Sequence, residues 1–265
     1  MNISSLSEIR TELLAGTYTL SQLIQSYLNE IDRSEDLNIY VNVFATEALQ
    51  RAEVLDQKLQ DDPGSLGRLF GAVVSIKDVI CYQEHEVTAG SKILNGFESL
   101  FNATAVERLL AEDAIIIGST NCDEFAMGSS NENSVYGPVK NADNPAYIPG
   151  GSSGGAAVSV QAGTCLIALG SDTGGSVRQP AAFCNVIGMK PTYGRISRHG
   201  LIAYASSFDQ IGIIAKNTED IALMLEVISG ADDYDSTVST ETVPSYLDQI
   251  SVNEKLKIGK SFFVQ

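Results

Sequence analysis

A serine that follows two glycines is the first candidate for chemistry in this sequence. Ser176 ends the run SDTGGS, after an apolar segment at residues 165–170 and at the predicted start of a helix that reaches Phe183. In such a turn the backbone N–H groups from Thr173 to Ser176 can converge on the negative oxygen that forms when a serine attacks an acyl group. The pattern therefore favours Ser176 as a nucleophile toward an acyl carbon.

A nucleophilic serine needs a base, and the sequence offers a lysine. The only histidines, His85 and His199, lack the context of a Ser–His–Asp triad. Lys77 follows the apolar run 71–76 and can act as a base if burial favours its neutral form. At a pKa of about 10.4, roughly one lysine in a thousand is neutral near pH 7.4, so the pKa must fall by about 2–3 units. An ion pair with Asp78 explains the same lysine equally well, and both interpretations stay open.

Glycine is concentrated beside these residues. Eight of the 23 glycines fall between positions 150 and 175, in a segment with almost no charge. This density predicts backbone packed closely around a bound group rather than an exposed linker. A phosphate suits the N–H groups of GGSSGG at 150–155, but the run lacks the G-K-[ST] ending of a phosphate loop and no dinucleotide fingerprint is present. A bound acyl group therefore remains the favoured interpretation.

The elements that must position these residues alternate between helix and strand. Thr19 and Gln22 have capping-box spacing at the start of an amphipathic pattern. Helices are predicted at 19–33, 46–59, 104–112, 156–163 and 217–229, and strands at 71–76, 114–118, 165–170 and, at the end of the chain, 256–265. This order is typical of an α/β fold with a largely parallel sheet, whose site lies at the carboxyl ends of its strands. Lys77 and the loop 119–130 both follow such ends.

Composition limits the classes of function. The 265 residues are 44% hydrophobic and 19% charged, which predicts a folded protein, and the formal net charge is −16. An acidic chain is poorly suited to grip nucleic acid unless a local patch or a partner supplies the basic contacts. Four scattered cysteines predict buried, reduced thiols in a cytosolic protein. Neither a signal peptide nor a membrane-spanning apolar stretch is expected.

Two long runs carry a resemblance to a known family. Residues 150–181 and 188–212 strongly resemble the amidase signature family. That resemblance implies an α/β/α sandwich around a mixed, largely parallel sheet. It also implies a triad of a nucleophilic serine, a bridging serine in a cis peptide and a lysine, which on this chain are Ser176, Ser152 and Lys77. The loop that stabilises the oxyanion is then formed by Thr173, Gly174 and Gly175.

Within the family, residues 123–155 are most similar to the A subunits of aspartyl/glutamyl-tRNA amidotransferases. The resemblance places Met127, Gly128 and Ser129 in the loop that lines a glutamine pocket, and it assigns no metal or cofactor to this chain. It implies a cytoplasmic complex with B and C subunits, in which the B subunit uses ATP and Mg and binds the aminoacyl-tRNA. Subunits of this type are nearly twice as long, so the C-terminal part of the fold and of the pocket is expected to be missing.

These observations predict one amidase-signature domain over residues 1–265. Its parts are a helical cover at 1–62, a catalytic core at 63–230 and a connecting segment at 231–265. Three functions are left open: the glutaminase part of an amidotransferase, a stand-alone amidase acting on a small carboxamide, and an inactive module that lacks part of its fold. The sequence does not predict whether Glu-tRNA(Gln) or Asp-tRNA(Asn) is served.

Overall fold

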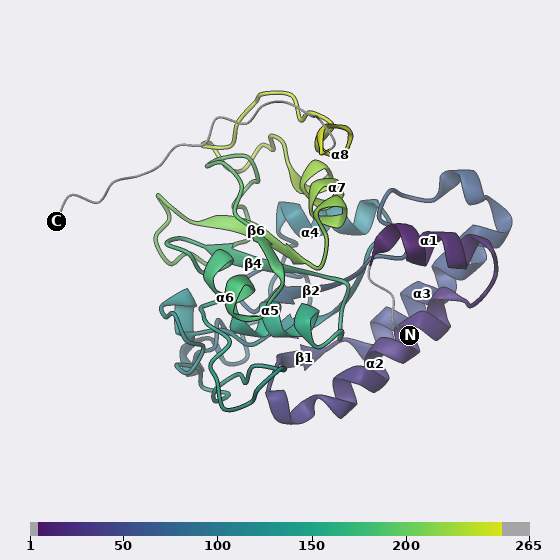
Figure 1. Ribbon diagram of the computed structural model, residues 1–265. Helices are drawn as coiled ribbons and strands as arrows, with labels where there is room; N and C mark the ends of the chain where they lie inside the picture. The colour runs from purple at the N-terminus through teal and green to yellow at the C-terminus, as the bar shows by residue number, and fades with distance from the viewer. Residues whose placement is uncertain (1–4, 251–265) are drawn as a thin grey trace.

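The computed structural model describes residues 5–250, and a mixed sheet lies at their centre (Figure 1). Within that range the sheet has six strands in the order β1-β3-β2-β4-β6-β5. Their bounds are Tyr40–Val43 (β1), Val73–Lys77 (β2), Ile115–Thr120 (β3), Ile167–Asp172 (β4), Ile187–Met189 (β5) and Gln210–Ala215 (β6). The three central strands β3, β2 and β4 are parallel, whereas β1 and β6 run antiparallel to their central neighbours and β5 runs antiparallel to β6. Thus β2, β3, β4 and β5 share one direction, which confirms the predicted mixed, largely parallel sheet.

Helices cover both faces of the sheet. They are α1 (Leu6–Leu14), α2 (Leu20–Arg33), α3 (Ala45–Asp61), α4 (Thr104–Ala111), α5 (Gly154–Gln161), α6 (Arg178–Phe183), α7 (Thr218–Ile228) and α8 (Tyr246–Gln249). On one face α5 packs across β2, β4 and β6, and on the other α7 packs on β6 and α4 packs on α7 (Figure 1). Gly170 of β4 lets α5 approach, because a Cβ there would lie 2.8 Å from Ser153 Oγ. The arrangement confirms the predicted α/β/α sandwich.

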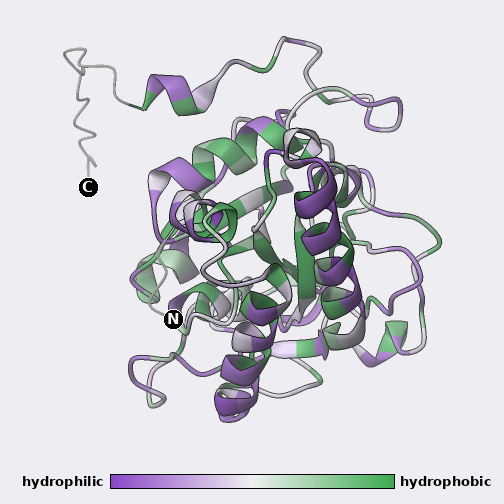
Figure 2. Ribbon diagram, turned by 90° about the vertical axis from the view of Figure 1, so that its right-hand side faces the viewer, coloured by the Kyte–Doolittle hydropathy of each residue, from purple (hydrophilic) through white to green (hydrophobic). Residues whose placement is uncertain are grey.

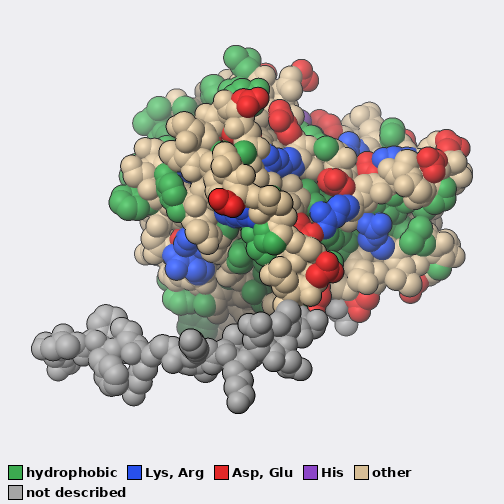
Figure 3. Space-filling model, turned by 90° about the horizontal axis from the view of Figure 1, so that it is seen from above, with side chains coloured by type: hydrophobic (Ala, Val, Ile, Leu, Met, Phe, Trp, Pro, Cys, Tyr) green, Lys and Arg blue, Asp and Glu red, His purple; other side chains and the backbone are tan. Residues whose placement is uncertain are grey.

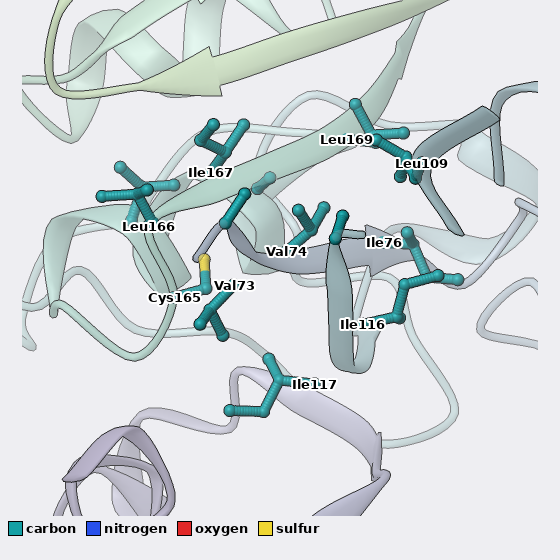
Figure 4. Packing of buried hydrophobic residues seen from close by; sticks show 14 of the residues in the cluster. Val73, Val74, Ile76, Leu109, Ile116, Ile117, Cys165, Leu166, Ile167 and Leu169 are labelled. Carbon is teal, nitrogen blue, oxygen red and sulfur yellow. The ribbon is translucent and has the colours of Figure 1, made fainter. Parts of the chain in front are cut away.

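The core explains why the central strands are largely apolar. Every residue of β2, β3, β4 and β6 is buried, as expected for strands covered on both faces. Figure 4 shows side chains of β2, β3 and β4 gathered in this core, among them Val74, Ile116 and Ile167. Hydrophobic residues lie on the strands inside the molecule, and hydrophilic residues lie on the outward faces of the helices (Figure 2).

The two predicted covering helices form as α2 and α3. Thr19 Oγ1 accepts from the Gln22 N–H at 3.1 Å and Gln22 Oε1 accepts from the Thr19 N–H at 3.0 Å, which confirms the capping box. Helix α3 packs against α2 and β3, and its Arg51 donates to the carbonyls of Leu110 and Ala114 at 2.6 and 2.7 Å. The division into cover, core and connecting segment stays a prediction.

Five elements were not predicted: α1, α8, β1, β5 and β6. The strands β1 and β5 have four and three residues, too few for a periodic pattern to show. The predicted strand at 256–265 lies outside the described residues. All four cysteines are buried and free, in agreement with the prediction of thiols. Between residues 5 and 250 none of the helices has the length and apolar character needed to cross a bilayer.

Candidate active site

Lys77 is the last residue of β2, and its side chain is fully buried. Its Nζ donates to Ser152 Oγ at 2.6 Å and to Ser171 Oγ at 2.9 Å. The carboxylate of Asp78 turns instead to the loop that follows, where it accepts the Thr88 hydroxyl at 2.5 Å and the Gly90 N–H at 3.1 Å. Across residues 5–250 Lys77 forms no ion pair. The structure therefore does not form the Lys77–Asp78 pair that the sequence left open.

Burial changes the protonation of this lysine. Loss of solvent lowers the pKa of Lys77 to about 8, although Cys122 and nearby carboxylates such as that of Asp123 act in the opposite direction. At a pKa of about 8, roughly one fifth of the amine is neutral near pH 7.4. A neutral amine at hydrogen-bond distance from the Ser152 hydroxyl can accept a proton from it. The geometry thus supports the base that sequence reasoning required.

Ser152 reaches Lys77 from the glycine-rich loop before α5. The Gly151–Ser152 peptide bond is cis, as the family resemblance implied. Ser152 is fully buried, and its carbonyl accepts from the Asp123 N–H at 3.3 Å. The next residue, Ser153, donates its N–H to the Ser176 carbonyl at 3.1 Å. Ser152 therefore lies between the lysine and the segment that carries the candidate nucleophile.

Ser176 lies in a turn rather than in a helix. The predicted start of the helix at Ser176 is wrong, since α6 begins at Arg178. The buried carboxylate of Asp172 accepts the Val177 N–H at 3.1 Å and also pairs with the Arg178 guanidinium at 2.9 Å. It thereby holds the turn from 173 to 177 at the start of α6, and the first helical hydrogen bond runs from the Gln179 N–H to the Gly175 carbonyl at 2.8 Å. No hydrogen bond joins the hydroxyls of Ser152 and Ser176 in the part of the chain that the structure describes.

The predicted oxyanion loop faces open space. A Cβ added to Gly174 or Gly175 would meet no atom within 4 Å. The Gly175 N–H donates to Asp172 Oδ1 at 2.8 Å, so that group already has an acceptor, whereas Gly174 makes no hydrogen bond within residues 5–250. Thr173 Oγ1 donates to Asp209 at 2.5 Å and anchors the start of the loop. Of the three predicted residues, Thr173 and Gly174 have N–H groups without an acceptor among residues 5–250, and these groups are left for a ligand.

The glycines at 150–155 have a different role from the one expected. A Cβ at Gly151 would lie 2.2 Å from Asp123 Oδ2, and one at Gly155 would lie 2.4 Å from the Asn121 carbonyl. Close packing against Asp123 and Asn121 therefore accounts for these two glycines. The free space that a bound group needs lies at Gly174 and Gly175 instead.

Residues 127–129, predicted to line the substrate pocket, lie near the turn that contains the oxyanion loop 173–175: the Ser129 carbonyl accepts from Gln179 of α6. All three are exposed, Met127 by 51%. The far end of their segment is fixed by Asp123, whose carboxylate accepts the N–H groups of Asn131 and Asn133 at 3.0 and 3.1 Å. Three segments thus meet at the carboxyl ends of β2, β3 and β4. They are residues 127–129, here called the pocket loop, residues 150–153, the Ser152 loop, and residues 173–177, the Ser176 turn.

Sequence reasoning missed Ser171 and Asp172. Ser171 is the second acceptor for Lys77, and Asp172 shapes the Ser176 turn. Both stand at the end of the predicted strand 165–170, next to the strand that ends in Lys77. The available signal was this adjacency, because polar residues at the carboxyl ends of neighbouring parallel strands meet. Among the described residues no three His, Cys, Asp or Glu side chains gather as a metal site would require.

Fold and site together define an α/β protein with a buried lysine–serine pair and a serine in a glycine turn. A family model described as Amidase matches residues 22–263. The chain belongs to this amidase family.

Named relatives agree with this membership. Over 267 residues the chain is 53% identical to the A subunit of the glutamyl-tRNA(Gln) amidotransferase from Chlorobium phaeobacteroides, covering 99% of this chain and 56% of the relative. A protein of the same name from Chlorobaculum tepidum is 53% identical, with 99% and 55% covered. The chain spans about half the length of the curated relatives it matches.

Two solved structures extend the comparison. The A subunit of the glutamyl-tRNA(Gln) amidotransferase from Thermotoga maritima is similar with a TM-score of 0.74 and 41% identity, over 84% of this chain and 46% of that one. The peptide amidase from Stenotrophomonas maltophilia is similar with a TM-score of 0.86 and 32% identity, over 94% of this chain and 53% of that one.

Proposed function

We propose that this chain is the triad-bearing part of the glutaminase subunit of a glutamine-dependent tRNA amidotransferase. The observation that carries the proposal is the 2.6 Å hydrogen bond from the buried Lys77 Nζ to Ser152 Oγ. The next residue, Ser153, donates its N–H to the Ser176 carbonyl and so connects the Ser176 turn to this pair. Relatives named as A subunits of glutamyl-tRNA(Gln) amidotransferase, at 53% identity, support glutamine as the amide that is cleaved.

In the proposed reaction neutral Lys77 accepts the proton of Ser152 while Ser152 accepts the proton of Ser176. Ser176 Oγ bonds to the side-chain carboxamide carbon of glutamine, and the carbonyl oxygen becomes negatively charged beside the loop of Thr173 and Gly174. The C–N bond then breaks, and the nitrogen receives the proton back through Ser152 and leaves as ammonia. Water hydrolyses the γ-glutamyl ester on Ser176, which yields glutamate and restores the serine.

The proton path has one link that forms only in the reacting complex. Lys77 and Ser152 are already hydrogen-bonded, whereas Ser152 and Ser176 are not. Catalytic hydrogen bonds are often long or poorly aligned before substrate binds and tighten in the substrate complex. We infer that a bound amide, seated between the pocket loop 127–129 and Gly174, brings the two hydroxyls together.

Partners complete the proposed activity. The ammonia passes to a B subunit that uses ATP and Mg to activate Glu-tRNA(Gln) or Asp-tRNA(Asn), with a C subunit in the same cytoplasmic complex. The net charge of −16 supports this division of labour. In Figure 3 acidic and basic side chains are interspersed on the face that is seen, without one continuous basic area for an RNA backbone.

The decisive experiment separates two nitrogen sources. We expect the chain, reconstituted with B and C subunits, to support amidation of Glu-tRNA with glutamine or with ammonium. Ser176→Ala should abolish the glutamine-driven reaction and leave the ammonium-driven reaction intact. Ser7→Ala, an exposed serine on α1, is the matched control. Loss of both reactions in Ser176→Ala would contradict the assignment.

A stand-alone amidase is the second candidate, supported by the likeness to a peptide amidase at a TM-score of 0.86. The triad is common to both candidates, so the chemistry of Ser176 does not separate them. Co-purification with a B-type subunit would favour the amidotransferase. Hydrolysis of small carboxamides by the chain without any partner would favour the amidase, and failure of Ser176 to react with any acylating agent would indicate an inactive module.

A further inference from the structure

A single side chain links three segments of the site. Gln179 lies on α6, three residues after Ser176. Its Nε2 donates to the Ser129 carbonyl of the pocket loop at 2.9 Å. Its Oε1 accepts from the Gly151 N–H at 2.9 Å, next to the Gly151–Ser152 peptide bond. The nucleophile's own helix is thereby connected to both the pocket loop and the loop of the bridging serine.

An amide side chain is suited to this bridge. A carboxamide offers a donor and an acceptor at the same end, whereas an ionised carboxylate only accepts and an apolar side chain does neither. The fit is also close, because a Cβ on Gly150 would lie 2.7 Å from Gln179 Oε1 and 3.0 Å from Pro180 Cα. The bridge therefore depends on both the length and the chemistry of glutamine.

Apart from this bond, the pocket loop has few hydrogen bonds to the rest of the protein. Its near flank is held by the Met127 N–H, which donates to the Glu124 carbonyl at 2.9 Å, and its far flank by the Asn131 N–H on Asp123 at 3.0 Å. Between these flanks, at 128–130, the bond from Gln179 to Ser129 is the one hydrogen bond that residues 5–250 supply. Gly128 packs against Asp123, and the Ser130 backbone packs against Gly151, but the hydrogen bonding of residues 128–130 depends on Gln179.

We propose that Gln179 is a positioning residue that couples the pocket loop to the Ser152 loop. The inference rests on the proposed function of Lys77, Ser152 and Ser176. Both loops are hydrogen-bonded to one side chain. The Gly151–Ser152 backbone therefore resists a displacement of the pocket loop, and the pocket loop resists a displacement of the Gly151–Ser152 backbone. Small misplacements of reacting groups are costly in rate, so this coupling keeps the bound amide in register with the nucleophile.

Two variants separate the halves of the bridge. Gln179→Glu keeps an acceptor for the Gly151 N–H and, when ionised, has no donor for Ser129. Gln179→Met has a similar length and makes neither bond. Gln161→Glu is the matched control, because Gln161 also bridges two partners: its Oε1 accepts from the Ala142 N–H and its Nε2 donates to Asn141 Oδ1, each at 3.0 Å, outside the site.

Residue-resolved hydrogen exchange on the full chain measures the two hydrogen bonds of Gln179 separately. The Gly151 amide reports the acceptor side, and the Met127 and Asn131 amides report the pocket loop. In Gln179→Met we expect exchange at all three amides to rise about fivefold, the usual weight of one neutral hydrogen bond. In Gln179→Glu we expect the rise at Met127 and Asn131 only, with Gly151 unchanged. Gln161→Glu should leave all three unchanged.

Phosphonylation of Ser176 by a fluorophosphonate, in which Ser176 Oγ bonds to phosphorus and fluoride leaves, provides the second readout when followed by mass spectrometry. We expect Gln179→Glu to be labelled within about twofold of the wild-type rate and Gln179→Met to be slowed about fivefold, since only the latter frees Gly151. Unchanged exchange at Met127 and Asn131 in both variants would overturn the proposal, as would a uniform rise along the chain or an equal rise in Gln161→Glu. Absence of labelling in the wild type would instead contradict the proposed function, and the exchange pattern would still decide the role of Gln179.

Discussion

Lys77 combines two properties that are rarely found together, full burial and the absence of an ion-pair partner among residues 5–250. Its hydrogen bonds go to the hydroxyls of Ser152 and Ser171. Hydroxyls stabilise an ammonium less than a carboxylate would, and so burial controls the protonation of the amine. This is the electrostatic setting that a lysine needs to act as a base at neutral pH.

The pH dependence of Ser176 phosphonylation follows from this setting. Neutral Lys77 is the reactive form, so the rate with a fluorophosphonate should rise about tenfold per pH unit below its pKa of about 8 and level off above it. Rates measured from pH 6 to 9.5 test this expectation. Lys77→Met should lower the plateau by about 10²- to 10⁴-fold and remove the inflection. A wild-type rate that does not depend on pH would contradict the role of Lys77.

Ser171 should tune the same inflection. Its hydroxyl accepts from Lys77 Nζ at 2.9 Å and so favours the charged amine. In Ser171→Ala the ammonium loses this acceptor, and the pKa of Lys77 should fall further below its ordinary value. The pH profile of fluorophosphonate labelling of the variant should therefore have its midpoint at a lower pH than that of the wild type. A midpoint that moves to higher pH would show that Ser171 does not act on the charged form.

Among the elements, α5 is the one whose placement depends most on glycine. Gly170 beneath it and Gly155 in its first turn both lie in contact with other segments. This close approach is what places Ser152, just before α5, against the buried end of β2. The glycines near Ser176 have the opposite character, because their missing side chains leave open space.

Two alanine substitutions should show this contrast. Gly155→Ala places a methyl group 2.4 Å from the Asn121 carbonyl and should lower the free energy of unfolding by about 1–3 kcal/mol. Gly174→Ala meets nothing within 4 Å and should change stability by about 0.5 kcal/mol or less, while it slows labelling of Ser176 by the fluorophosphonate because it fills the space at the oxyanion loop. Denaturant unfolding and labelling rates measure the two effects. Equal destabilisation by both variants would contradict the distinction.

For the whole molecule, the acidic surface separates chemistry from RNA binding. The net charge of −16 predicts that the chain alone does not hold tRNA. In a mobility-shift assay near 0.15 M salt, we expect no retained complex at protein concentrations up to about 10 μM, within the range of non-specific affinities. Addition of a B subunit should produce the shift. Tight binding of tRNA by the chain alone would show that a local basic surface outweighs the net charge.

Local sequence patterns were sufficient to predict much of the secondary structure. The strands β2, β3 and β4 follow from continuous apolar runs, because burial on both faces leaves no polar alternation. The capping box of α2 and the glycine turn at Ser176 depend on residues a few positions apart, and the sequence places such features correctly. The predicted helix start at Ser176 was two residues early, because Ser176 belongs to the turn that the Asp172 carboxylate holds and α6 begins at Arg178.

The partners of the site residues were decided by tertiary structure alone. Lys77 and Ser152 are 75 positions apart, and Lys77 and Ser171 are 94 apart. Residue types allowed an ion pair with Asp78 equally well, and only the packing of β2 beside β4 excluded it. Ser152 was identified by family resemblance. No sequence pattern indicated Gln179, because its two hydrogen bonds join residues that are 28 and 50 positions apart. Composition and periodicity act over short distances along the chain, whereas a catalytic contact exists only after the sheet has brought distant strand ends together.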